Sequence, residues 1–102
     1  MDEKAYRMWL EQEKDYNTAR TYAARCFRIE NDLKINLDQE YISDQGKSLM
    51  ERLKYSKDEF RNMKQPKCGI VLNPKTNMYS CMNSLRVSVK KYFEFKTAQE
   101  CK

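Results

Sequence analysis

Residues 17–33 read NTARTYAARCFRIENDL, and the fold of the chain can be worked out from this stretch. Apolar side chains recur in it at intervals of three and four residues, the pattern of a helix with one buried face. These side chains are Ala19, Tyr22, Cys26, Ile29 and Leu33. The opposite face carries Arg20, Thr21, Ala24, Arg25 and Arg28. The first face predicts a helical domain, and the second predicts a contact surface.

The charge order along residues 17–33 supports a contact surface. Glu30 and Asp32 place negative charge near the C-terminal end of the predicted helix, and the arginines precede them. This order opposes the helix dipole, so helix stability does not explain it. The basic part of the helix is therefore a candidate site for an anionic partner.

The preceding segment predicts a first helix over about residues 2–14, which Asp2 can cap. Its inner side carries Ala5, Met8, Trp9 and, as a further candidate, Tyr6. Asp15 or Asn17 can cap the second helix, which is expected over about residues 17–34. We expect the first two helices to pack through these apolar sides.

The middle of the chain predicts a connection and two short helices. In residues 34–43 three apolar side chains are expected to tuck under the bundle, namely Ile35, Leu37 and Ile42. Ser43 or Asp44 can cap a helix over about residues 44–55, whose apolar positions are Leu49, Met50 and Leu53. Ser56 and Glu59 form a capping-box pattern before a helix over about residues 57–63.

Residues 64–78 contain both prolines and predict a long loop, in which residues 70–72 form either a short strand or a pinned loop. The last helix is expected over about residues 79–96. Its buried stripe is Met82, Leu85, Val89, Tyr92 and Phe93, and its outer face carries Asn83, Arg86, Lys90 and Lys91. Residues 96–102, with Cys101, are expected to fray.

Composition agrees with a single all-α domain over residues 1–102: four to five helices in a bundle, with one long loop before the last helix. The chain has only two glycines and two prolines, which favours long helices over a many-stranded sandwich. Hydrophobic residues make up 40% and include seven tyrosines, enough to build a core. The net charge of +5 permits an anionic partner without requiring one.

Several classes of function lack the residues that they need. There is no histidine, so His-dependent triads and HNH-type metal sites are excluded, and no glycine-rich phosphate loop occurs. The four cysteines form no CxxC pair, and Cys26 falls on the apolar stripe as a small hydrophobe. We therefore expect no enzyme activity, no metal or other cofactor and no small-molecule ligand. Without a signal sequence or a membrane-length apolar run, a reducing cytoplasm is the expected setting and no membrane is expected as a partner.

Two motifs resemble a known family. The first is Asn17-Thr18 followed by Thr21-Tyr22, with the trailing Ile35, Leu37 and Ile42-Ser43-Asp44. The second is Arg86, Val89-Lys90-Lys91-Tyr92 and Phe95. In their order and spacing they resemble the N-terminal core-binding (SAM-like) domain of tyrosine recombinases and phage integrases, and a related domain begins some restriction-type endonucleases.

The resemblance implies a helical bundle that grips one side of duplex DNA, while a separate domain catalyses DNA integration or recombination. The expected partners are double-stranded DNA, a catalytic domain located elsewhere and further copies of the chain on DNA. By position it points to eight DNA-contacting residues: Thr18, Arg20, Thr21, Arg25, Arg28, Arg86, Lys90 and Lys91. Arginine and lysine neutralise phosphates, threonine fixes register, and arginine can also read guanine in the major groove.

Other interpretations remain open. Basic residues on an amphipathic helix are often a solvated face, and Arg28 can simply pair with Asp32. Lys67 and Lys75 in the loop can also meet phosphate, whereas Trp9, Tyr22 and Tyr92 are assigned to the core rather than to base stacking. The alternative function is a helical protein-interaction or dimerisation module, with residues 70–72 as its exposed apolar patch. The two basic helix faces form one surface only if they lie side by side.

Overall fold

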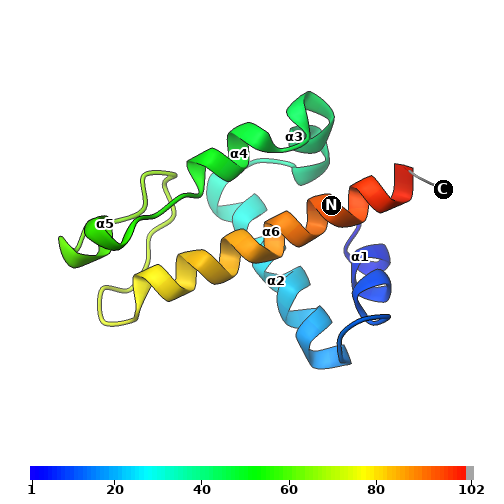
Figure 1. The fold of residues 1–102 in the computed structure, drawn as a ribbon, viewed down its shortest axis with the longest axis horizontal. Helices are drawn as coiled ribbons and strands as arrows, with labels where there is room; N and C mark the ends of the chain where they lie inside the picture. The colour runs from blue at the N-terminus through cyan, green and yellow to red at the C-terminus, as the bar shows by residue number, and fades with distance from the viewer. Residues whose placement is uncertain (101–102) are drawn as a thin grey trace.

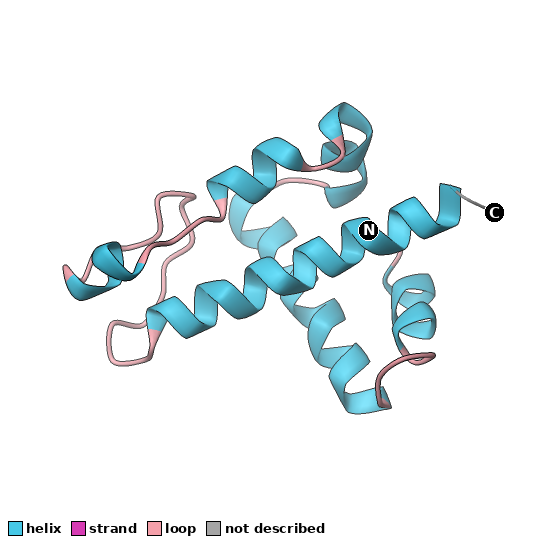
Figure 2. Ribbon diagram, in the orientation of Figure 1, coloured by secondary structure: helices cyan, strands magenta, loops and turns pink. Residues whose placement is uncertain are grey.

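The structure, a computed structural model, describes residues 1–100. This range contains six helices and no strand, so the predicted all-α class is confirmed (Figure 2). The helices are α1 (Glu3–Leu10), α2 (Tyr16–Leu33), α3 (Leu37–Asp44), α4 (Lys47–Arg52), α5 (Lys57–Arg61) and α6 (Met78–Glu100). The expected frayed end at residue 96 is wrong, because α6 continues to Glu100, and the expectation for Cys101 lies outside the described residues.

The long helix α6 is the central element of the bundle. It crosses α2 in the most extensive helix contact and also packs against α1, α4 and α5 (Figure 1). Its predicted stripe is confirmed, since Met82, Leu85, Val89, Tyr92 and Phe93 are all buried. Short side chains allow a close approach between α2 and α6: the Sγ of Cys26 lies 3.2 Å from the carbonyl oxygen of Ser88.

The buried face of α2 differs from the predicted stripe by a small rotation. Ala19, Cys26 and Ile29 are fully buried as predicted, and Ala23 is buried with them. Tyr22 and Leu33 are only half-buried. The rotation arises because α2 packs against both α1 and α6, so that two sides of the helix are covered.

Helix α1 ends at Leu10, so the predicted end at residue 14 is wrong, whereas its predicted inner side is confirmed for Tyr6, which is buried, and for Ala5 and Trp9, which pack half-buried against the core. Asp2 caps it by accepting the Ala5 amide hydrogen, as expected. Met8, however, is 58% exposed, and the buried residues are Tyr6 and Leu10. The Tyr6 hydroxyl donates to the Ser88 carbonyl over 2.9 Å, and this buried hydrogen bond fixes the rotation of α1 against α6.

The predicted connection at residues 34–43 is wrong in its second half, because α3 occupies Leu37–Asp44. Asn36 caps this helix by accepting hydrogen bonds from the Asp38 and Gln39 amides. Leu37 is buried as predicted, but Ile42 is 73% exposed because the helical turn places Tyr41 inward instead.

The predicted helix over residues 44–55 is also corrected, because α4 is limited to Lys47–Arg52. Gly46 separates α3 from α4 with a positive φ of 80°, a conformation that ends one helix and starts another in a new direction. Asp44 caps the turn by accepting from the Gly46 and Ser48 amides.

The segment between α5 and α6 is a pinned loop. The Gln65 side chain accepts the Leu72 amide hydrogen and donates to the Leu72 carbonyl, as a neighbouring strand would. Ile70 and Leu72 are therefore buried, and only Val71 is exposed, at 77%. The apolar patch predicted at residues 70–72 is wrong, whereas the capping box of Ser56 and Glu59 is confirmed.

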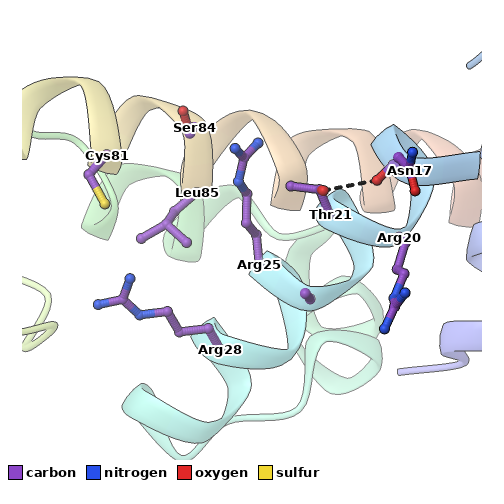
Figure 3. Close-up of a pocket in the computed structure, with 9 residues that line it drawn as sticks. Asn17, Arg20, Thr21, Arg25, Arg28, Cys81, Ser84 and Leu85 are labelled. Atoms are coloured by element: carbon purple, nitrogen blue, oxygen red, sulfur yellow. Dashed lines mark hydrogen bonds between the residues drawn. The ribbon is translucent and has the colours of Figure 1, made fainter. Parts of the chain in front are cut away.

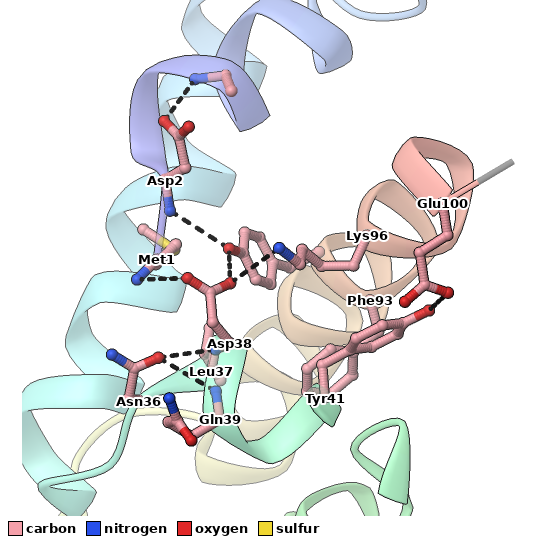
Figure 4. Close-up of polar contacts among 12 residues, drawn as sticks. Met1, Asp2, Asn36, Leu37, Asp38, Gln39, Tyr41, Phe93, Lys96 and Glu100 are labelled. Carbon is pink, nitrogen blue, oxygen red and sulfur yellow. Dashed lines mark hydrogen bonds and ion pairs between the residues drawn. The ribbon is translucent and has the colours of Figure 1, made fainter. Parts of the chain in front are cut away.

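A polar cluster around Asp38 joins α1, α3 and α6 (Figure 4). The Met1 ammonium lies 3.3 Å from the Asp38 carboxylate and 3.4 Å from Glu30. Tyr92 donates its hydroxyl to Asp38, and the Lys96 ammonium lies 3.5 Å away. Partial burial raises the pKa of Asp38, but the Tyr92 hydrogen bond and the two ammonium groups outweigh it and hold that pKa below its usual value.

Replacing Asp38 with asparagine is expected to lower the free energy of unfolding at pH 7 by about 1–2 kcal/mol, because the Lys96 ammonium loses its carboxylate partner and the Met1 ammonium keeps only Glu30. Since the pKa of Asp38 is depressed in the folded state, its contribution is complete above the unfolded value of about 4 and declines as pH falls through the folded value. Urea unfolding of both proteins between pH 7 and pH 3 measures this difference. A constant difference down to pH 3 would contradict the assignment.

Candidate nucleic-acid interface

A groove of about 600 Å³ lies between the outer face of α2 and the first half of α6 (Figure 3). Six residues of α2 line one wall: Asn17, Arg20, Thr21, Ala24, Arg25 and Arg28. Cys81, Ser84 and Leu85 of α6 line the other. The groove exists because α6 crosses α2 against its buried face, which leaves the arginine face open beside it.

The start of α2 is held by local hydrogen bonds that place Asn17, Thr18 and Thr21. Asp15 caps the helix by accepting the Thr18 amide hydrogen at 2.7 Å. This backbone hydrogen bond is the main reason that the pKa of Asp15 lies below its usual value. The Thr21 hydroxyl donates to the Asn17 carbonyl at 2.9 Å. Asn17, Thr18, Thr21, Tyr22 and Arg25 also line a smaller hollow of about 240 Å³ beside the groove.

The three arginines of the groove differ in how far their charge is compensated. Arg20 is exposed and has no ion-pair partner among residues 1–100. Arg25 lies over the Tyr22 ring at 5.8 Å, a cation–π contact that leaves its charge unneutralised, and in Figure 3 it extends toward α6. Arg28 pairs with Asp32 at 3.2 Å, as the alternative interpretation expected. Within the groove only this one arginine is paired with a carboxylate.

Lys91 of α6 does not belong to the groove. Its ammonium lies 3.3 Å from both Glu13 and Glu94 and over the Trp9 ring at 5.4 Å. Burial lowers the pKa of Lys91, but hydrogen bonds and attraction from the two carboxylates exceed this effect and raise it overall. Lys91 therefore joins α6 to the segment between α1 and α2, with its charge compensated.

Arg86 and Lys90 lie on another side of α6. Arg86 lines a small cavity with Leu53, Tyr55 and Tyr79 and is half-buried there. Lys90 lines a separate groove on the α3 and α4 side. The helices α2 and α6 are in contact, but Arg86, Lys90 and Lys91 do not extend the arginine face into one basic surface.

The structure adds residues to the groove that the sequence interpretation did not select. Ser84 and Cys81 are separated by one helical turn and face α2. The available signal was the recurrence of small side chains at Cys81, Ser84 and Ser88, which marks where another helix can approach α6.

The two cysteines beside the α2–α6 contact should differ sharply in reactivity. Burial raises the pKa of the Cys26 thiol to about 12, whereas Cys81 is half-exposed at the groove. In variants that keep one of the two as the sole cysteine, Cys26 should react with a thiol reagent at pH 7 at least about 100-fold more slowly than Cys81, because the thiolate is the reactive species. Absorbance at the release of the reagent's chromophore measures both rates, and equal rates would contradict the placement of Cys26.

No protein-family model, curated protein or solved structure matches this chain. Among the residues that the structure describes, no helix is both long and apolar enough to cross a membrane. Residues 1–100 also contain no group of three or more side chains that could hold a metal ion.

Proposed function

We propose that the chain is a non-catalytic module that binds double-stranded DNA through the arginine groove. The supporting observation is the groove lining: three arginines, of which only Arg28 is paired with a carboxylate, together with the short polar side chains of Asn17, Thr21 and Ser84. Guanidinium groups neutralise phosphates, and short polar side chains hydrogen-bond to phosphate oxygens and fix register. The groove is suited to a backbone of regularly spaced negative charges.

The resemblance to core-binding domains supports the same function. Five of the eight positions that it points to, Thr18, Arg20, Thr21, Arg25 and Arg28, lie around the groove or the hollow beside it. Under this proposal the chain supplies DNA binding in integration or recombination, and the residues of strand exchange belong to a separate domain. A restriction-type endonuclease with this module at its front is the alternative setting.

A salt titration tests the proposal. Fluorescence anisotropy with a blunt 20-base-pair duplex should show binding at about 50 mM salt, with log K falling against log salt at a slope of about −3 for three phosphate contacts. Absence of binding at that salt concentration, or a slope near zero, would refute phosphate binding through the groove.

Cys81 provides a probe of where the DNA binds. Its thiol lines the groove wall opposite the arginines, so a bound duplex should slow its labelling several-fold. The rate of Cys81 labelling in the absence of DNA is the reference. Unchanged labelling at saturating DNA would place the duplex elsewhere on the protein.

A protein-interaction module is the second candidate, favoured by a largely apolar groove of about 500 Å³ between α3, α4 and α6. Its lining includes Tyr41, Met50 and Phe93. Replacing half-buried Met50 with glutamate would place a charge in this groove. Light scattering at rising protein concentration distinguishes the cases: self-association lost in this variant supports the second candidate, and a monomer at all concentrations argues against dimerisation.

A further inference from the structure

Two aromatic side chains on α2 are more than half exposed to solvent. Tyr16 is 57% exposed and Phe27 is 54% exposed, although the other aromatics of α1 and α6 are buried or half-buried in the core. Isolated exposed apolar residues are ordinary on protein surfaces. Here, however, the two rings share a helix face with Arg20, one of the three arginines of the groove.

The helical spacing places the aromatics beside the groove. Tyr16, Arg20, Phe27 and Asn31 follow one another at intervals of four, seven and four residues, so they lie along one line of α2. Arg20 also lines the groove, and it therefore connects the two features. Tyr16 and Phe27 are about 16 Å apart along the helix axis, so that one base cannot contact both rings.

The charges around this face favour a polyanion over a protein partner. Two carboxylates in the second half of α2 are already engaged: Glu30 binds the Met1 ammonium and the Leu37 amide, and Asp32 pairs with Arg28. Arg20 has no carboxylate partner within residues 1–100. An exposed face with aromatic rings on either side of an uncompensated arginine matches the stacking and phosphate contacts that hold unpaired nucleotides.

We propose that the preferred ligand is DNA in which a duplex adjoins unpaired nucleotides, with duplex phosphates in the groove and an unpaired base stacked on Phe27. This inference rests on the proposed function and narrows its substrate class. In an intact duplex the bases are stacked on each other, so a ring on the helix surface finds no exposed base face. An unpaired base offers that face, and stacking tolerates any sequence.

The test compares three labelled DNAs in fluorescence anisotropy: a blunt duplex, the same duplex with a tail of unpaired thymidines, and the duplex with an abasic tail of equal length. The abasic tail keeps the phosphates and removes the bases. The thymidine tail should bind about 5- to 100-fold more tightly than the abasic tail. Phe27→Ala and Phe27→Leu should abolish this preference and leave blunt-duplex affinity unchanged, whereas Phe27→Trp should keep it.

A matched control is Ile42→Ala, which removes an exposed apolar side chain on α3 and should leave the preference intact. Equal binding of the two tailed DNAs, or a preference that survives both Phe27→Ala and Phe27→Leu, overturns the inference while duplex binding stands. Loss of blunt and tailed binding alike in these variants, with helical circular dichroism preserved, also overturns it, because the ring would then act on intact duplex. Absence of binding to every DNA refutes the proposed function itself.

Discussion

A variant with Arg20, Arg25 and Arg28 all replaced by glutamate is expected to bind a blunt duplex at least about 100-fold more weakly than the unchanged protein at 50 mM salt. Counterion release from three phosphate contacts alone raises the binding constant by a factor of about 10³ at this salt concentration. The new carboxylates add repulsion from the phosphates. Anisotropy titrations from 50 to 300 mM salt measure the loss of affinity and the slope of log K against log salt. The magnitude of this slope should decrease by about 3 wherever residual binding can be followed.

The triple replacement in the groove should have little effect on folding, because Arg20 is exposed and the ion pair between Arg28 and Asp32 is half-exposed. A matched control replaces Lys47, Arg52 and Lys64 with glutamate. These three cations are exposed, lie outside the groove and have no ion-pair partner among residues 1–100. The control changes the net charge by the same amount as the triple replacement in the groove. If both triple variants lose affinity by the same factor, general charge and not the groove accounts for binding.

Replacing Gly46 with alanine is expected to lower the free energy of unfolding by about 2–5 kcal/mol. A φ of 80° costs an L-residue about 1–2 kcal/mol, and an added methyl group in a filled space costs about 1–3 kcal/mol. The Cβ of an alanine would overlap the ring of Phe93 at Cε2. Phe93 cannot easily move, since it is 7% exposed and its ring stacks on Tyr41. Urea unfolding followed by circular dichroism measures the loss.

Gly69→Ala provides the matched control for the backbone contribution. Gly69 also has a positive φ, of 103°, but its added Cβ would meet only Leu33 Cδ2, at 3.8 Å. The free energy of unfolding of this variant should therefore fall only by the cost of a positive φ, about 1–2 kcal/mol. Equal losses in the two variants would show that the ring of Phe93 yields at no cost and would contradict the expected clash.

Periodicity predicted the long helices well, because α2 and α6 each bury a continuous stripe. It failed at α3, where the buried residues Leu37 and Tyr41 form a single pair one turn apart and Ile42 adds an apolar side chain that points outward. A local signal was present, since Asn36 precedes the acidic first turn of Asp38 and Glu40. Capping chemistry was therefore the better guide for this short helix.

The candidate site was predictable on α2 alone. One helix fixes the relative positions of its own side chains, so Arg20, Arg25 and Arg28 share a face as expected. The relation between two helices depends on their crossing and on their rotations about their axes. Small side chains, Ser84 and Ser88 among them, determine which side of α6 meets α2, and this leaves Arg86 and Lys90 facing elsewhere.

The central position of α6 has a consequence for how the chain is synthesised. During translation residues 1–77 emerge before the helix that most of the other helices pack against. The apolar sides of α1 and α2, with Tyr6, Leu10 and Ile29, then lack the helix that makes the most extensive contact with α2. Completion of the core must wait for α6 to leave the ribosome, a delay of seconds at ordinary rates of elongation. In that interval the apolar surface that α6 covers in the folded domain is exposed, and such surface is prone to aggregation.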